Sequence, residues 1–160
     1  MLQWIDTIIQ GILLGGLYAL FAAGLSLIFG IMRLVNLAHG DLIILAAFVL
    51  LALTSWLGIN PFVAALIALP LMFVVGFALQ FIILNRALGR DILPPLLVTF
   101  GISIIIENGL LEAFSADSRL LRTGDISTAS IQIGGGIALG VMPVLTFLSA
   151  IAVILLLNLL

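Results

Sequence analysis

The densest group of polar side chains lies in the segment RLVNLAHGD, residues 33–41, between two long apolar runs. Three of its side chains can bind ligands or exchange protons, namely Asn36, His39 and Asp41. The apolar run that follows is short for a membrane span, so part of this segment is expected at membrane depth. Irregular backbone at that depth must pack against protein or line a watery cavity. Gly40 would permit the break in the backbone.

We call residues 33–41, which join the two apolar runs, the corner, and two interpretations of it stay open. In the structural interpretation, Asp41 or Asn36 caps the following helix and His39 bonds to a backbone carbonyl. In the functional interpretation, Asn36, His39 or Asp41 lines a translocation path or couples it to a cytoplasmic partner. Alanine substitutions separate the two, because loss of a structural residue lowers protein abundance whereas loss of a functional residue lowers turnover.

A second polar feature is the set Thr99, Ser103 and Glu107, spaced by four in an apolar run. This spacing places the three side chains along one face of a helix. Glu107 falls about 6 Å inside the expected helix end, where a carboxylate is costly unless it is paired or hydrated. We therefore expect the stripe to face protein or a translocation path. The alternative is that Glu107 reaches the membrane interface beside Asn108 and Glu112.

The other residue types exclude several kinds of chemistry. The sequence has no cysteine, no lysine and a single histidine. A thiol nucleophile, a zinc cluster, a Schiff base and a Walker A lysine are therefore excluded. Glycines 134–136 lack the Lys-Ser/Thr of a phosphate loop, and a flexible turn is expected there. We predict no catalytic residue, no metal and no cofactor, and any ATP hydrolysis must occur in another subunit.

The composition identifies the solvent of these segments as lipid. Hydrophobic residues make up 64% of the chain, charged residues 8%, and the mean hydropathy is +1.48. In a soluble domain, about a quarter of all residues are charged. The net charge of -2 and the lack of basic runs exclude nucleic acid as a partner. We predict an all-α, polytopic membrane protein that packs as a transmembrane helix bundle in the lipid bilayer.

Five apolar runs are long enough to cross a bilayer core about 30 Å thick. We expect helices at about 7–31, 42–57, 61–84, 93–111 and 136–160, with a polar loop over 112–135. We expect them to form a single transmembrane domain over 1–160. The chain ends inside the apolar sequence LLLNLL, so it is expected to be the N-terminal portion of a larger protein.

Proline and arginine add local expectations. Asn60 followed by Pro61 is typical of a helix N-terminus. Pro70 and Pro143 lie inside apolar runs, where proline removes a backbone hydrogen bond, so kinks are expected at both.

Arginines in short loops prefer the cytoplasm. Arg33, Arg86 and Arg90 are therefore expected on the cytoplasmic side, with the N-terminus outside. The polar loop 112–135 would then lie outside as well, with Arg119 and Arg122 among its acidic residues.

Small side chains repeat every four residues in the first helix, at Gly11, Gly15, Ala19 and Ala23. This spacing makes a helix-packing seam along which another backbone can approach closely. The partner is either a neighbouring helix of the same chain or another subunit, and we favour the neighbouring helix.

Two separated segments resemble a known family. GILLGGLYALFAAGLSLIFGIMRLVNLAHGDLIILAAF (11–48) and LPPLLVTFGISIIIENGLL (93–111) are similar, in this order, to permeases of the high-affinity branched-chain amino-acid ABC transporter family. The resemblance extends along essentially the whole chain. Asn36, His39, Gly40 and Asp41 match the family's Asn-x-Ala-His-Gly-acidic pattern, which identifies the family without assigning substrate contacts.

The resemblance implies a transport subunit that is not an enzyme, in the plasma (inner) membrane of a prokaryote. It implies as partners a second permease subunit, cytoplasmic ATP-binding subunits and a periplasmic substrate-binding protein. Members of the family are longer than this chain, so this portion is not expected to transport alone. Related branches move urea, short amides or aromatic amino acids, and the substrate stays open among them.

Two other functions stay open. A secondary transporter or channel would show uptake that is driven by an ion gradient and persists without nucleotide. A non-transporting scaffold would show no uptake at all in vesicles.

Overall fold

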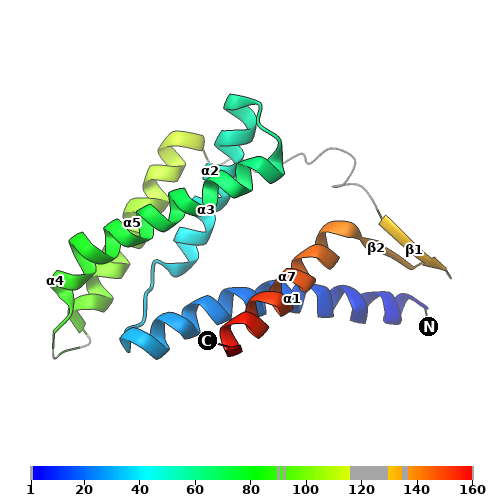
Figure 1. Ribbon diagram of the computed structural model, residues 1–160, viewed down its shortest axis with the longest axis horizontal. Coiled ribbons are helices and arrows are strands. Elements are labelled where there is room, and N and C mark those ends of the chain that lie inside the picture. The colour runs from blue at the N-terminus through cyan, green and yellow to red at the C-terminus, as the bar shows by residue number, and fades with distance from the viewer. Residues whose placement is uncertain (1, 90, 92, 116–129, 135–136, 160) are drawn as a thin grey trace. The chain divides into compact units, whose positions relative to one another are not determined.

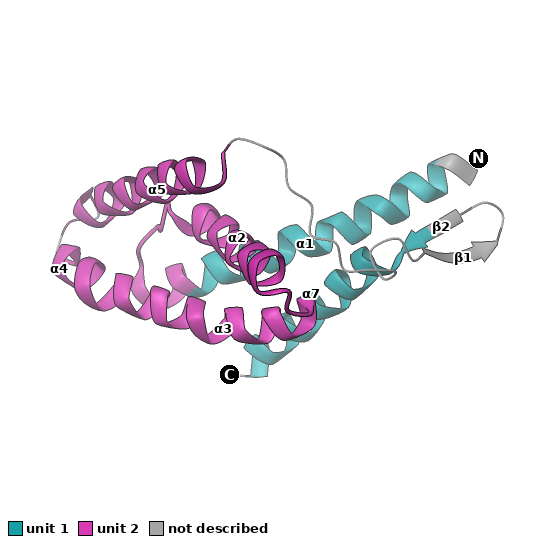
Figure 2. Cartoon of the chain, turned by 90° about the horizontal axis from the view of Figure 1, so that it is seen from above, with its two compact units in different colours: residues 1–27, 122–160 teal, residues 28–121 magenta. Residues whose placement is uncertain are grey.

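The structure is a computed structural model that describes residues 2–89, 91, 93–115, 130–134 and 137–159. Within these residues, five helices are long and apolar enough to cross a membrane. The predicted class, an all-α polytopic membrane protein, is confirmed. The chain forms two compact units, residues 1–27 with 122–160 (unit 1) and residues 28–121 (unit 2), as Figure 2 shows.

Unit 1 contains most of helix α1 (Leu2–Met32), the strands β1 (Ser130–Gly134) and β2 (Ile137–Gly140), and helix α7 (Val141–Leu159). The two strands pair as an antiparallel hairpin, with Ser130 opposite Gly140. α7 crosses α1 (Figure 1), and Phe147 packs against Gly16 at the crossing. A Cβ at Gly16 would come within 3.2 Å of the Phe147 Cα, so this crossing depends on glycine.

The start of the fifth helix was wrong in the sequence prediction. Its first residues pair as strand β2, and the helix begins at Val141 rather than near 136. The predicted kink at Pro143 is also wrong, because this proline lies in the first turn of α7. The first N–H groups of a helix have no intrahelical partner, so the missing donor interrupts nothing. Of the predicted turn at 134–136, Gly134 ends β1 and the other two residues lie outside the described residues.

α1 ends at Met32 because the next residue leaves helical geometry. Arg33 has a φ of 53°, and its backbone N–H still donates to the Phe29 carbonyl at 2.9 Å. A left-handed conformation costs a non-glycine residue roughly 1–2 kcal/mol. Despite this cost the helix ends at Arg33 and not at the expected Gly40, which lies within the first turn of the next helix. Residues 33–38 connect the helices and bury Leu34 and Ala38.

Unit 2 contains α2 (His39–Leu57), α3 (Pro61–Ala78), the π-helix η1 (Leu79–Leu84), α4 (Asn85–Ala87) and α5 (Leu93–Phe114). α2 packs against both α3 and α5 (Figure 1). α2 includes His39–Asp41, so these polar residues complete a 19-residue span, as the short apolar run required. Gly58, with a φ of 66°, ends α2 in the left-handed conformation that glycine adopts readily.

The start of α3 follows the sequence closely. The Phe62 backbone N–H donates to Asn60 Oδ1 at 3.0 Å, and Pro61 occupies the first helical position. This confirms the predicted N-terminus. α3 is unbroken across Pro70.

The π-helix was not predicted. Its hydrogen bonds run from residue i to i+5, so side chains five apart come close to one face. Gln80 Nε2 accordingly donates to Asn85 Oδ1 at 2.9 Å.

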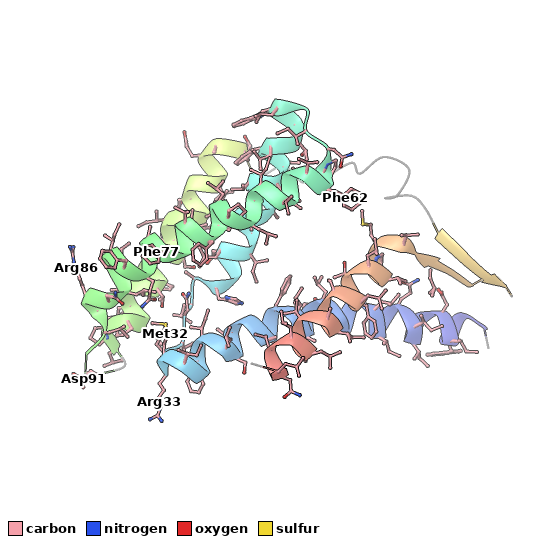
Figure 3. All side chains as sticks on the ribbon, viewed as in Figure 1. Met32, Arg33, Phe62, Phe77, Arg86 and Asp91 are labelled. Carbon is pink, nitrogen blue, oxygen red and sulfur yellow. The ribbon has the colours of Figure 1, made fainter. Side chains whose placement is uncertain are left out.

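The described arginines of unit 2 lie at one end, together with Asp91. Figure 3 shows Arg33, Arg86 and Asp91 there, with Phe62 at the opposite end. Three arginines of the sequence, at 90, 119 and 122, lie outside the described residues. This placement agrees with the expectation that Arg33 and Arg86 face the same side of a membrane.

The polar loop expected over 112–135 begins later than predicted. α5 continues to Phe114. The Phe114 ring lies 4.7 Å from the Phe48 ring and 5.9 Å from the Trp56 ring, measured between centroids. These contacts with α2 stabilise the last turn of α5. Residues 116–129 lie outside the described residues.

Candidate functional site

The two polar regions of unit 2 meet each other. The Leu37 backbone N–H donates to Thr99 Oγ1 at 3.2 Å, and Ser103 Oγ donates to Asp41 Oδ2. Each pair is separated by 62 residues in sequence, and the second bond repeats the first four residues further along both segments. We call these four residues, Leu37, Asp41, Thr99 and Ser103, the polar clasp. It joins the corner before α2 to the face of α5.

Thr99 is the most deeply buried member of the polar clasp, with none of its surface exposed. Its hydroxyl donates to the Leu96 carbonyl at 3.0 Å and accepts from the Leu37 N–H, so it serves as donor and acceptor at once. Leu37 lies outside any helix. Without this bond its N–H would have no partner among the described residues, and a partly buried amide without a partner costs roughly 1–3 kcal/mol.

Asp41 lies in the first turn of α2, where the unpaired N–H groups favour negative charge. The residue at the N-cap position itself, Ala38, has no side-chain cap. The Asp41 carboxylate instead accepts the hydroxyl of Ser103 across the helix pair. A hydrogen bond to a charged acceptor is stronger than one between neutral groups. This bond therefore ties the start of α2 to the middle of α5.

Asn36 shapes the backbone just before α2. Its Oδ1 accepts from the Ala38 N–H at 3.0 Å, and its carbonyl accepts from the His39 N–H at 3.2 Å. An asparagine that bonds to the backbone two residues ahead makes a local turn. His39 is half-buried and begins α2. The structure thus places Asn36 and His39 in one turn, which leads directly into the first turn of α2, where Asp41 lies.

A cavity of about 220 Å³ lies beside Asn36 within unit 2. Its walls come from the end of α1, the corner, α2, the α3 to η1 segment and α5. Eight of the ten lining residues are aliphatic residues, methionine or glycine, and the other two are Asn36 and Gln80. No lining residue carries a charge. The site thus combines a polar clasp, whose members are hydrogen-bonded to one another, with an apolar cavity that has two amides.

The third residue of the polar stripe lies apart from the polar clasp. Glu107 is exposed on α5, and within the described part of the chain it has no hydrogen-bond or ion-pair partner. The stripe is therefore paired at Thr99 and Ser103 and open at Glu107. Its part in a translocation path stays a prediction.

The helix-packing seam is exposed at Gly11, Gly15 and Ala19 and half-buried at Ala23. A Cβ at Gly11 or Gly15 would meet no atom within 4 Å, in contrast to the glycine that packs against α7. Within unit 1, the contact face of α1 is thus adjacent to the seam and does not coincide with it. The partner of the seam stays a prediction.

The sequence analysis missed Gly76 and Gln80, which both line the cavity. Gln80 is the only polar residue in the apolar run 61–84. A polar side chain inside a membrane span is a recognised sign of function, and this signal was available. Nothing in the sequence distinguishes Gly76 from other helical glycines.

Residues 7–160 match the family described as branched-chain amino acid transport system / permease component. The chain is 26% identical, over 91% of its length, to the high-affinity branched-chain amino acid transport system permease protein BraD of Pseudomonas aeruginosa. It is 27% identical, over 67% of its length, to the permease protein LivH of Salmonella typhimurium and 26% identical, over the same share, to LivH of Escherichia coli.

The chain spans about half the length of the curated relatives it matches, 50% of BraD and 37% of each LivH. No solved structure matches it significantly. The relatives are named as transport permease proteins, and the five apolar helices agree with a multi-pass membrane protein.

Proposed function

The chain belongs to the family of branched-chain amino acid transport permease components, and from this premise we propose that it forms part of the translocation path of an ATP-driven importer. The substrate would be a branched-chain amino acid or a related amino acid. The observation that carries the proposal is the family match over residues 7–160, nearly the whole chain. The named relatives transport branched-chain amino acids as parts of high-affinity systems.

The structure supports a division of labour among the predicted site residues. Two hydrogen bonds join the corner to α5, one to Thr99 and one between Ser103 and Asp41. These three residues therefore position the corner against α5. Asn36 lines the cavity that the corner borders, so it is the corner residue best placed to meet a substrate. His39, at the start of α2, belongs with the positioning residues. Glu107, exposed on α5, would act toward parts of the transporter beyond unit 2.

The importer needs partners that this chain does not supply. The sequence has no lysine and hence no Walker A motif, so separate cytoplasmic ATP-binding subunits would hydrolyse ATP. A second permease subunit would complete the path, and a periplasmic binding protein would deliver the substrate. The end of unit 2 that carries Arg33 and Arg86 would face the cytoplasm of a prokaryote, because arginines in short loops favour that side.

Uptake in proteoliposomes tests this function. The permease from its complete gene is reconstituted with its partner subunits, and radiolabelled leucine is supplied with the binding protein. We expect accumulation that requires ATP on the side of the ATP-binding subunits and persists when ionophores collapse ion gradients. Uptake that is driven by an ion gradient without nucleotide would instead identify a secondary transporter. Uptake of urea or short amides in place of leucine would identify a related branch.

A further inference from the structure

The cavity beside the corner is suited to an apolar guest. A volume of about 220 Å³ would hold several water molecules at roughly 30 Å³ each, and each buried water needs two to four polar partners. Only two of the ten lining residues are polar. Walls that are mainly apolar favour an apolar molecule over a cluster of water. An aliphatic group is therefore a better occupant than a cluster of water.

The two amides each retain one unused group at this cavity. Asn36 Oδ1 accepts from the Ala38 N–H, which leaves the Nδ2 donor with no partner among the described residues. Gln80 Nε2 donates to Asn85, which leaves Oε1 as an acceptor with no partner in the same part of the chain. One open donor and one open acceptor complement the carboxylate and the ammonium group of an amino acid, respectively. The apolar walls complement its aliphatic side chain.

The π-helix explains why Gln80 is held in this way. Its i to i+5 geometry places Asn85 where it can accept from Gln80, so one end of the amide is fixed. π-helical turns occur frequently at functional sites. The same segment begins just after Gly76, whose carbonyl accepts from the Leu79 N–H.

Gly76 leaves open space beside the cavity that it lines. A Cβ built at this residue would meet no atom within 4 Å. We propose that the cavity holds the branched aliphatic side chain of the transported amino acid, and that Gly76 sets the largest side chain that fits. This inference rests on the proposed importer function. It adds the place where the substrate side chain is recognised and the residue that limits its size.

Substitution of Gly76 by alanine and by valine tests the proposal in the complete reconstituted transporter. Rates are measured with binding protein saturated in turn with alanine, valine or leucine, so that the binding protein's own affinity does not set the order. With Gly76→Val, we expect the leucine rate to fall about tenfold or more relative to the alanine rate, because one or two methyl groups in a fitted site change discrimination by 10–200-fold. Gly76→Ala should give a smaller shift in the same direction.

Gly109→Val is the matched control. Gly109 lies in α5, is exposed, has no atom within 4 Å of a built Cβ, and does not line the cavity. It should leave the leucine to alanine ratio at the unaltered value. Folding of each variant is monitored by the yield of assembled complex. Gly76→Ala is expected to fold, because alanine favours a helix more than glycine does.

A ratio that stays constant in both Gly76 variants, in a transporter that still imports, would overturn the cavity assignment alone. An equal loss for all three substrates would also overturn it, because a lipid chain or simple packing in the cavity predicts that result. A complete lack of ATP-driven amino-acid uptake by the unaltered transporter would instead refute the proposed function, and the inference with it.

Discussion

The polar clasp and the cavity lie side by side in unit 2, and they use polar groups in opposite ways. In the polar clasp, the Thr99 hydroxyl is bonded as both donor and acceptor, and the Asp41 carboxylate accepts from Ser103. In the cavity, Asn36 and Gln80 are each fixed at one end and open at the other. Polar groups that bond to each other across two segments hold those segments together, whereas amides with an unused donor or acceptor beside a cavity can receive a ligand.

This difference predicts which substitutions lower stability and which lower transport. Removing a member of the polar clasp leaves a partly buried group unpaired and should lower the amount of folded protein. Changing a residue of the cavity should leave folding intact and alter substrate handling. The following variants test that separation, in order of decreasing expected effect.

Ser103→Ala should have the largest effect, because it removes the donor to a partly buried carboxylate. We expect a loss of about 1.5–3 kcal/mol in the free energy of unfolding, the range for hydrogen bonds to charged groups. Chemical denaturation of the purified protein in detergent measures this value. Ser149→Ala is the matched control, since Ser149 is exposed and bonds only to the Thr146 carbonyl of its own helix at 2.8 Å. Equal stability of the two variants would show that the hydrogen bond from Ser103 to Asp41 does not stabilise the protein.

Thr99→Val keeps the shape of the side chain and removes the hydroxyl. We expect a loss of about 1–2 kcal/mol, because the Leu37 N–H is left without an acceptor. The same unfolding measurement applies. Thr54→Val is the control, since the Thr54 hydroxyl donates only to the Leu50 and Leu51 carbonyls of α2, both at 2.9 Å. If Thr54→Val destabilised the protein as much as Thr99→Val, the bond between the corner and α5 would have no special weight.

Asn36→Ser tests both roles of one residue, because Asn36 shapes the backbone of the corner and also lines the cavity. A serine hydroxyl can make the same turn more weakly, so the fold should be retained with a loss below about 1 kcal/mol. The amide donor at the cavity is lost, and the leucine uptake rate should fall by up to about tenfold, equivalent to 1.4 kcal/mol. Uptake per assembled complex is the measurement. A fall in complex yield with unchanged uptake per complex would place Asn36 with the polar clasp.

Glu107→Gln should have the smallest effect on stability. Glu107 is exposed and unpaired in the described part of the chain, so the change should stay within about 0.5 kcal/mol. Uptake is measured alongside. Lower uptake at unchanged stability would place Glu107 in the path, as the stripe predicted, and a large loss of stability would contradict its exposed position.

Much of this arrangement could be predicted from the sequence, because lipid imposes strong rules. The five spans follow from the length of the apolar runs, and the start of α3 follows from the Asn60 cap. The stripe on α5 follows from residues spaced by four. The burial of Thr99 is compatible with the prediction that this stripe faces protein or a path.

Other features depend on contacts that no local pattern encodes. The pairing of Leu37 with Thr99 joins residues 62 apart in sequence. The break at Arg33 places a non-glycine residue at positive φ, where sequence rules favour Gly40. The π-helix replaces a regular helix in a continuous apolar run, and the hairpin replaces the first turn of the fifth helix.

Substrate protection of a single cysteine tests the central claim most directly, and this stretch of the chain contains no native cysteine. Gly76→Cys and Gly109→Cys are introduced separately into the complete transporter, and the rate of thiol labelling on this chain is followed with and without leucine-loaded binding protein and ATP. The account predicts that leucine slows labelling of Gly76→Cys several-fold and leaves labelling of Gly109→Cys unchanged. Labelling of Gly76→Cys at the same rate with and without leucine would contradict it.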